Sequence, residues 1–244
     1  MAARTYTSEQ LVGRFEDQRD LRNIMGKISY CCVLKQEKDI FPLFWSNRED
    51  VCLGVNDGWY QGPAAVKGYF DAFYARTLYT TKVLKELYPE KLGDKTEEEA
   101  YGVAMMNIKP VDTAVIEVAG DGQTAKGVWY VRGSHNELTT SGPVAYWTFG
   151  VFAVDFVRED GAWKIWHMQY LEDLNTPQGK AWGKKDVEPY PPMAGYENIQ
   201  PFEKPEPTTK VCLRAYYSPD RPFTPLMEPP APYETFAETF SYGC

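Results

Sequence analysis

Two histidines, His135 and His167, are the side chains best suited to carry a proton near neutral pH. His167 lies in an extended run, where alternation places it on the same face as the apolar Trp163 and Ile165. We therefore expect His167 to point into the core, either as a proton carrier or as a buried histidine bonded to a tyrosine or a backbone carbonyl. His135 ends another extended run, where a surface position at a loop edge is favoured over a catalytic one.

A carboxylate could orient such an imidazole, and Asp173 follows the run that carries His167. Asp173 is equally well explained as a polar residue at the exit of a strand. Several aromatic side chains could line a pocket for a planar or apolar molecule, although most of them also suit an ordinary core. These candidates for ligand contact are Trp45, Trp59, Tyr60, Tyr69, Trp147 and Tyr170.

Composition excludes several other kinds of site. No glycine-rich phosphate loop, Ser-His-Asp order or metal-ligand cluster is present, so neither a cofactor nor a metal is expected. The five cysteines lack C-x-x-C spacing and are interpreted as reduced thiols. A net charge of -8 and a pI near 5.0 argue against nucleic acid as a partner. No run has the roughly 20 apolar residues of a membrane helix, and Met1–Thr5 lacks a signal-peptide pattern, so a cytoplasmic protein is expected.

Three helical patterns precede a series of strands. Thr7 and Gln10 fit a capping box before a long amphipathic helix that includes residues 22–34. A short element follows at residues 40–45, and Pro63 opens a third helix that continues toward residue 87. Residues 89–106 are charged and contain glycine, which predicts a surface insertion with a short helix over residues 96–106.

Four extended runs occupy residues 114–119, 124–132, 144–157 and 162–171, with a longer loop expected over residues 136–143. Helices followed by strands indicate an α+β fold with an antiparallel sheet. Thirteen of the 18 prolines lie from Pro177 to Pro232, so residues 177–244 should be extended. Because this tail is also rich in aromatic residues, we expect it to pack across its own domain, residues 1–176, or across a neighbouring subunit.

Certain strings and their order resemble the nuclear transport factor 2-like superfamily, and within it the SnoaL-like group of polyketide cyclases and related dehydratases. The strings are Lys38-Asp39-Ile40-Phe41 after the first helix, Trp59-Tyr60-Gln61-Gly62-Pro63 before the third, and the paired last strands around Glu159-Asp160-Gly161. The resemblance covers roughly residues 10–175. It implies a cystatin-like cone, in which a curved sheet encloses helices and an apolar pocket, in a dimer or trimer. It does not imply one particular reaction, because proteins with this fold include dehydratases, isomerases, cyclases and proteins without catalytic activity.

The resemblance also suggests roles for two residues near the end of the first helix. Tyr30, expected on the inner face of that helix, corresponds to a tyrosine that polarises a substrate oxygen in related dehydratases and isomerases. The catalytic aspartate of those relatives has no counterpart, since Lys35 or Gln36 stands in its place. Lys35 could substitute only if burial lowered its pKa, and a surface lysine is the preferred interpretation.

Two functions remain open from the sequence. The first is a cofactor-free lyase or isomerase that dehydrates, isomerises or cyclises a small apolar or aromatic oxygenated molecule. His167 would then be the general acid or base, Tyr30 a hydrogen-bond donor, and Asp173 or His135 an orienting partner. The second is a protein of the same fold that binds a ligand or assembles into an oligomer without catalysis, which the missing aspartate favours. A variant of the second has the tail filling a neighbour's pocket.

Overall fold

The computed structural model describes residues 6–184, 188–224 and 227–244; residues 1–5, where the sequence lacks a signal-peptide pattern, lie outside this range. Helix α1 (Ser8–Val33) begins at the predicted capping box, in which the Thr7 hydroxyl accepts from the backbone N–H of Gln10 at 3.2 Å and the Gln10 side chain accepts from that of Thr7 at 2.9 Å. One stripe of the helix is buried, formed by Leu21, Met25, Ile28 and Cys31.

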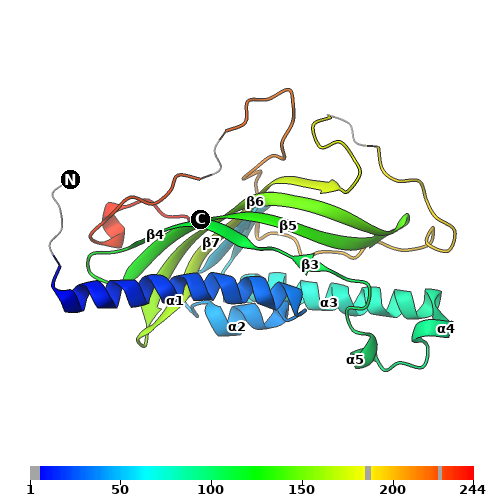
Figure 1. The fold of residues 1–244 in the computed structure, drawn as a ribbon, viewed down its shortest axis with the longest axis horizontal. Coiled ribbons are helices and arrows are strands. Elements are labelled where there is room, and N and C mark those ends of the chain that lie inside the picture. Colours follow the sequence, from blue (N-terminus) through cyan, green and yellow to red (C-terminus); the bar gives the residue numbers. More distant parts are fainter. Residues whose placement is uncertain (1–5, 185–187, 225–226) are drawn as a thin grey trace.

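The remaining helices are η1 (Glu37–Asp39), α2 (Ile40–Phe44), α3 (Pro63–Leu87), α4 (Pro89–Leu92), α5 (Glu97–Ala100) and η2 (Phe236–Glu238). Of these, η1 and α2 contact α1, α4 and α5 contact α3, and η2 belongs to the tail. Pro63 stands in the first turn of α3, where the missing N–H has no cost. The predicted insertion contains α4 and α5, two single turns at the far end of α3 (Figure 1). No helix in the described ranges is long and apolar enough to cross a membrane.

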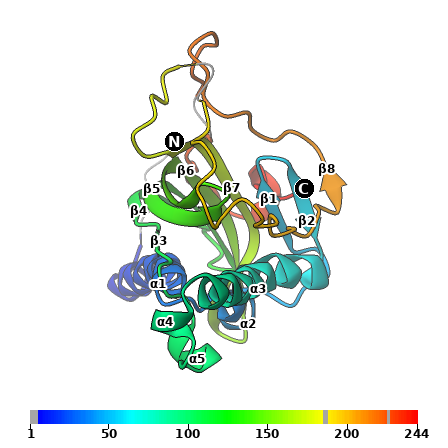
Figure 2. The ribbon, with the colours of Figure 1, turned by 90° about the vertical axis from the view of Figure 1, so that its right-hand side faces the viewer.

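A strongly curved sheet covers one side of the helices (Figures 1 and 2). Its strands are β1 (Cys52–Val55), β2 (Gly58–Gln61), β3 (Asn107–Ile108), β4 (Val111–Val118), β5 (Thr124–Thr139), β6 (Gly142–Glu159), β7 (Ala162–Pro177) and β8 (Thr209–Lys210). Their order is β3-β5-β6-β7-β1-β2-β8, with β4 also paired to β5. Neighbours are antiparallel except β1 and β7. The fold is therefore the predicted α+β cone.

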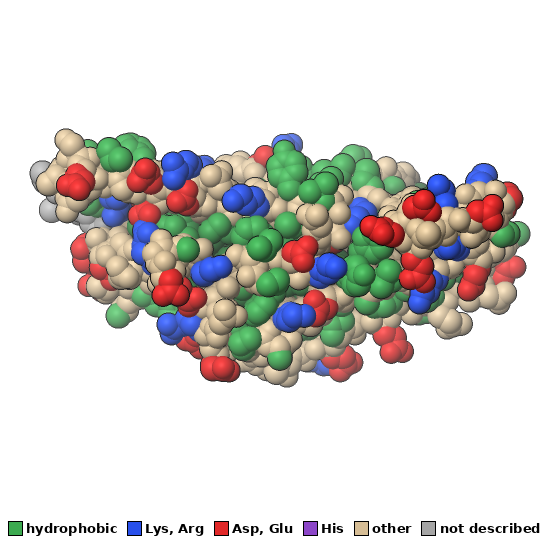
Figure 3. Space-filling view, turned by 90° about the horizontal axis from the view of Figure 1, so that it is seen from below, with side chains coloured by type: hydrophobic (Ala, Val, Ile, Leu, Met, Phe, Trp, Pro, Cys, Tyr) green, Lys and Arg blue, Asp and Glu red, His purple; other side chains and the backbone are tan. Residues whose placement is uncertain are grey.

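The core lies between the concave face of the sheet and the helices. Trp45, Phe70, Phe156 and Ile165 are among its buried side chains. The outer face of the helices is different in character, since apolar side chains there are interspersed with acidic and basic ones (Figure 3).

Strands β5 and β6 are longer than predicted. They remain paired along their whole length to Thr139 opposite Gly142, so the loop expected over residues 136–143 was wrong. The polar composition of this stretch was mistaken for a loop, but it is a two-stranded extension whose concave side faces a cavity. Only residues 140–141 form the turn.

A β-bulge interrupts β7. Ile165 pairs with Phe156 and His167 pairs with Asp155, which leaves Trp166 as an extra residue between two successive pairs. Side chains on a strand alternate between faces, and one extra residue inverts that alternation. Trp163 and Ile165 therefore point into the cone, whereas His167 points to the outer face of the sheet.

Much of the tail lies against its own domain (Figure 2). Residues 202–216 run past the edge strand β2, where β8 pairs with it. Residues 227–244 return across the outer face of the sheet, where Tyr242 packs against Val128 and Ala153.

Candidate active site in the mouth of the cone

The wide end of the cone encloses a cavity of about 580 Å³. The sheet, helix α3 and the tail each contribute to its walls, the tail through Phe202, Lys204, Pro205, Glu206, Pro207, Lys210 and Tyr216. The Tyr60 hydroxyl donates to the carbonyl of Pro205 at 2.6 Å and so fixes the tail wall to strand β2. The tail lines the cavity of its own chain and leaves space for a small molecule.

His135 lies in the wall of this cavity and is only 7% exposed. Its Nδ1 is 3.1 Å from the hydroxyl of the buried Thr148, and its ring stacks on Tyr146 at a centroid distance of 5.2 Å. Burial, followed by the nearby Lys109 ammonium, lowers the pKa of His135 from 6.5 to about 4. The imidazole is thus neutral at physiological pH and its Nε2 lies on the side of Glu137, 3.8 Å from the carboxylate. The expected surface position was wrong.

Charged pairs surround this imidazole. Arg76 on α3 donates from Nη1 to Glu137 at 3.0 Å. The Tyr170 hydroxyl donates to Glu172 at 2.6 Å, and the Lys109 ammonium lies 4.5 Å from the Tyr170 ring centroid. Burial and the adjacent Glu172 raise the pKa of Tyr170 well above its usual value. Tyr170 is accordingly a neutral phenol, and its hydroxyl proton is already donated in the hydrogen bond to Glu172.

Three buried polar atoms beside the cavity lack a hydrogen-bond partner among the described residues. They are Arg76 Nε, Asn107 Oδ1 and Glu37 Oε2, and of these residues Arg76 and Asn107 line the cavity itself. The other oxygen of Glu37 accepts from Asn107 Nδ2 at 3.2 Å, and burial raises the pKa of Glu37. Unpaired buried donors and acceptors are costly, so these atoms favour a polar ligand group at this depth.

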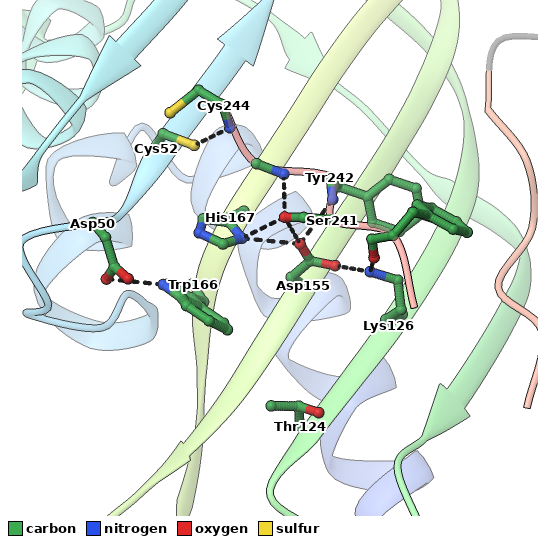
Figure 4. A network of polar contacts seen from close by, with 12 residues as sticks. Asp50, Cys52, Thr124, Lys126, Asp155, Trp166, His167, Ser241, Tyr242 and Cys244 are labelled. Atoms are coloured by element: carbon green, nitrogen blue, oxygen red, sulfur yellow. Dashed lines mark hydrogen bonds and ion pairs between the residues drawn. The ribbon is translucent and has the colours of Figure 1, made fainter. Parts of the chain in front are cut away.

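The structure places His167 away from the cavity, in a network on the outer face of the sheet (Figure 4). Its Nδ1 is 2.9 Å from Asp155 Oδ2, and the buried Asp155 forms an ion pair with Lys126. Ser241 donates its hydroxyl proton to the same Asp155 oxygen at 2.9 Å, and the backbone N–H of Tyr242 donates at 2.8 Å. The expected inward orientation was wrong because of the bulge at Trp166.

Tyr30, Asp173 and Lys35 also lie outside the cavity. Tyr30 is 69% exposed, because it falls two residues after Ile28 and so about 200° around the helix from the buried stripe. Asp173 forms an ion pair with Arg214 of the tail instead of partnering His167. Lys35 is half-buried at the end of α1, where burial lowers its pKa.

The six aromatic candidates divide into two groups. Tyr60, Tyr69 and Tyr170 line the cavity. Trp45 is fully buried between Phe41 and Phe70 in the core. Trp59 and Trp147 do not line the cavity, and Trp147 is exposed on the outer face of the sheet.

Sequence reasoning named His135 as a candidate but favoured a surface position for it, and it missed Arg76, Lys109, Asn107, Glu137 and Glu172. A usable signal existed for two of these cavity residues. Alternation from Trp129 and Val131, if carried on past Arg132, leads to His135 and Glu137 on the same concave face. No group of three or more potential metal-ligating side chains occurs in the described parts of the chain.

Comparisons with known proteins found solved structures with some similarity to this chain. The hexachlorocyclohexane dehydrochlorinase LinA-type3 from Novosphingobium barchaimii is similar in structure, with a TM-score of 0.48, 14% identity and coverage of 69% of this chain and 94% of that one. A nuclear transport factor 2-like protein with a cystatin-like fold from Novosphingobium aromaticivorans is also similar, with a TM-score of 0.44 and 14% identity. That match covers 69% of this chain and 92% of the other. A search of curated proteins found no significant match.

The family assignment comes from the sequence of the cone itself. Residues 14–169 match the SnoaL-like domain, and this range contains most of α1, all of α3, strands β1 to β6 and the first half of β7. Because the match covers more than half of the 244 residues, it is decisive for membership. The chain belongs to the SnoaL-like domain family.

Proposed function

We propose that the chain is a cofactor-independent enzyme that transfers a proton on a small aromatic or apolar oxygenated molecule held in the cone. Dehydration, isomerisation and cyclisation are the reactions of this class. The observation that carries the proposal is a neutral, buried His135 in the wall of a 580 Å³ cavity, with cationic groups beside it. Because its pKa is lowered, the imidazole carries no extra proton at neutral pH and its lone pair is available, whereas an exposed imidazole would be half protonated at pH 6.5.

His135 is the proposed general base. In the tautomer with its proton on Nδ1, the ring donates to Thr148 Oγ1, and the lone pair of Nε2 is available to a substrate C–H or O–H. Proton uptake creates an imidazolium, and Glu137, at 3.8 Å from Nε2, stabilises that charge. Thr148 and the stacked Tyr146 hold the plane of the ring.

Arg76 and Lys109 are the proposed electrophilic groups. The unpartnered Nε of Arg76 supplies an N–H to a substrate oxygen that gains negative charge as the proton leaves. The Lys109 ammonium also lines the cavity and lies 3.9 Å from Glu172. The Tyr170 phenol already donates to Glu172, so it shapes the cavity and is not assigned a proton-transfer role.

A ligand-binding protein without catalysis is the second candidate. One feature favours it, namely that two carboxylates of the cavity are paired: Glu137 with Arg76, and Glu172 with Tyr170 and Lys109. Such pairing suits recognition of a polar ligand as well as it suits chemistry.

A base-promoted elimination separates these candidates. With 5-nitrobenzisoxazole, removal of the ring C–H proton breaks the N–O bond and releases a coloured nitrophenolate, so the rate reports a base beside an apolar site. We expect His135→Gln to lower the rate at least about 10²-fold, the lower bound for general base catalysis. His167→Gln is the matched control and should leave the rate unchanged. Saturable binding of the probe without a rate above that of free imidazole would favour the binding protein.

A further inference from the structure

Two cysteines far apart in the sequence meet at the outer face of the sheet, beside the cluster of Lys126, Asp155 and His167. Cys52 begins strand β1 and pairs with His167 of β7, so its side chain lies next to that imidazole. Cys244 follows the tail segment that covers this face (Figure 4). The backbone N–H of Cys244 donates to Cys52 Sγ at 3.1 Å.

The separation of the two residues suits a covalent bond. An N···Sγ distance of 3.1 Å places the Cα of Cys244 within about 4.6 Å of Cys52 Sγ, because the N–Cα bond adds about 1.46 Å. A disulfide needs the two Sγ atoms about 2.05 Å apart, and from this position of its Cα the Cys244 side chain can turn its Sγ toward Cys52 by rotation about the Cα–Cβ bond. The two thiols already contact each other, and Gln61 Nε2 donates to Cys244 Sγ at 3.4 Å.

The tail is held in this position by the buried ion pair beneath it. Ser241 and the Tyr242 N–H both donate to Asp155, and the carbonyl of Phe240 accepts from the Lys126 ammonium at 2.5 Å. Gly243 lies directly on the His167 imidazole, so close that an added Cβ would be 2.8 Å from the ring. These contacts hold Cys244 beside Cys52 in one orientation, which raises the effective concentration of one thiol at the other.

We propose that Cys52 and Cys244 form a reversible disulfide that locks residues 227–244 across the outer face of the sheet. The chain is fully reduced in this structure, with Cys52 buried and Cys244 exposed. The oxidant is a low-molecular-weight disulfide such as oxidised glutathione, which can reach the exposed thiol but not the buried one.

The chemistry proceeds by two thiol–disulfide exchanges. Cys244 loses its proton to solvent, and its thiolate attacks one sulfur of oxidised glutathione; that S–S bond breaks and one glutathione thiolate leaves. The Cys52 thiolate then attacks Cys244 Sγ and expels the second glutathione. Two cysteine thiols are oxidised by two electrons, and one oxidised glutathione becomes two reduced molecules. Burial and the neighbouring Cys244 thiol raise the pKa of Cys52, so the second exchange is the slower one and accelerates with pH.

Thiol counting after controlled oxidation tests this proposal. The full chain is reduced, equilibrated with graded mixtures of oxidised and reduced glutathione, quenched in acid, denatured and alkylated with N-ethylmaleimide. We expect the number of alkylated cysteines to fall from five to three, with a Cys52–Cys244 peptide in the digest. Five alkylated cysteines, or glutathione retained on Cys244 without closure, would refute the proposal.

Three variants make the assignment specific. Cys212→Ser removes another exposed thiol of the tail and should still lose two alkylation sites. Cys244→Ser, at an exposed position, should lose none. Cys52→Ala, at a buried position, should also lose no alkylation sites on oxidation. Loss of two alkylation sites in either variant would overturn the pairing of Cys52 with Cys244. Because the bond would enclose 191 residues, the oxidised wild type should melt several degrees above the reduced form, and Cys244→Ser should show no such shift.

Discussion

The neutral state of His135 can be measured through the pH dependence of folding. The pKa of His135 is lowered from 6.5 to about 4 in the folded chain, so the unfolded chain binds more protons at acid pH. Stability contributed by this group is therefore complete above pH 6.5 and decreases as the pH falls toward 4. Between pH 8 and pH 5.5 the linkage relation gives a loss of about 1.4 kcal/mol from this histidine alone.

The assay is urea denaturation followed by tryptophan fluorescence at those two pH values, which avoids pH 5.0, the pI. Other groups titrate as well, so the informative quantity is the difference between the wild type and His135→Gln. The wild type should lose about 1.4 kcal/mol more than the variant on going from pH 8 to pH 5.5. Equal losses in the two proteins, within about 0.3 kcal/mol, would refute the argument that burial keeps His135 neutral.

Other substitutions test separate parts of the structure. Asp155→Ala leaves the Lys126 ammonium buried and unpaired and should lower the free energy of unfolding by about 3–5 kcal/mol, measured in urea. Gly243→Val should displace the tail, because its Cβ would meet the imidazole beneath; faster proteolytic cleavage within residues 227–244 with an unchanged elimination rate is the expected result. Met25→Ala should cost about 2–5 kcal/mol and Tyr30→Ala less than about 0.5 kcal/mol; equal costs would mean that the buried stripe of α1 is misplaced.

The fold was predictable because its signals are local and repeated. The capping box at Thr7 and the proline at position 63 fixed two helix starts, and alternation located four strands that the structure confirms. The lengths of strands β5 and β6 were harder to predict. The polar residues in their extension fit a loop and fit equally well a strand that lines a polar cavity.

The site was harder to predict because it depends on single-residue events in the backbone. The bulge at Trp166 has no sequence signature, yet it decides that His167 faces outward. The position of Tyr30 around helix α1 places it outside the core. Counting about 100° per residue from the buried Ile28 would have predicted this exposed position. Arg76 and Lys109 reach the cavity from different elements, and no spacing in the sequence relates them.

The tail wall of the cavity has a consequence for how members of this family diverge. The matched domain ends at residue 169, whereas Phe202, Pro205 and Tyr216 lie beyond it and still line the cavity. In the proposed function, the tail wall of the cavity and the general base His135 thus belong to separate stretches of the sequence. Exchange, lengthening or loss of the tail would change one wall of the cavity and leave the proposed base His135 in place, so on this proposal a new substrate range can arise by recombination at one junction.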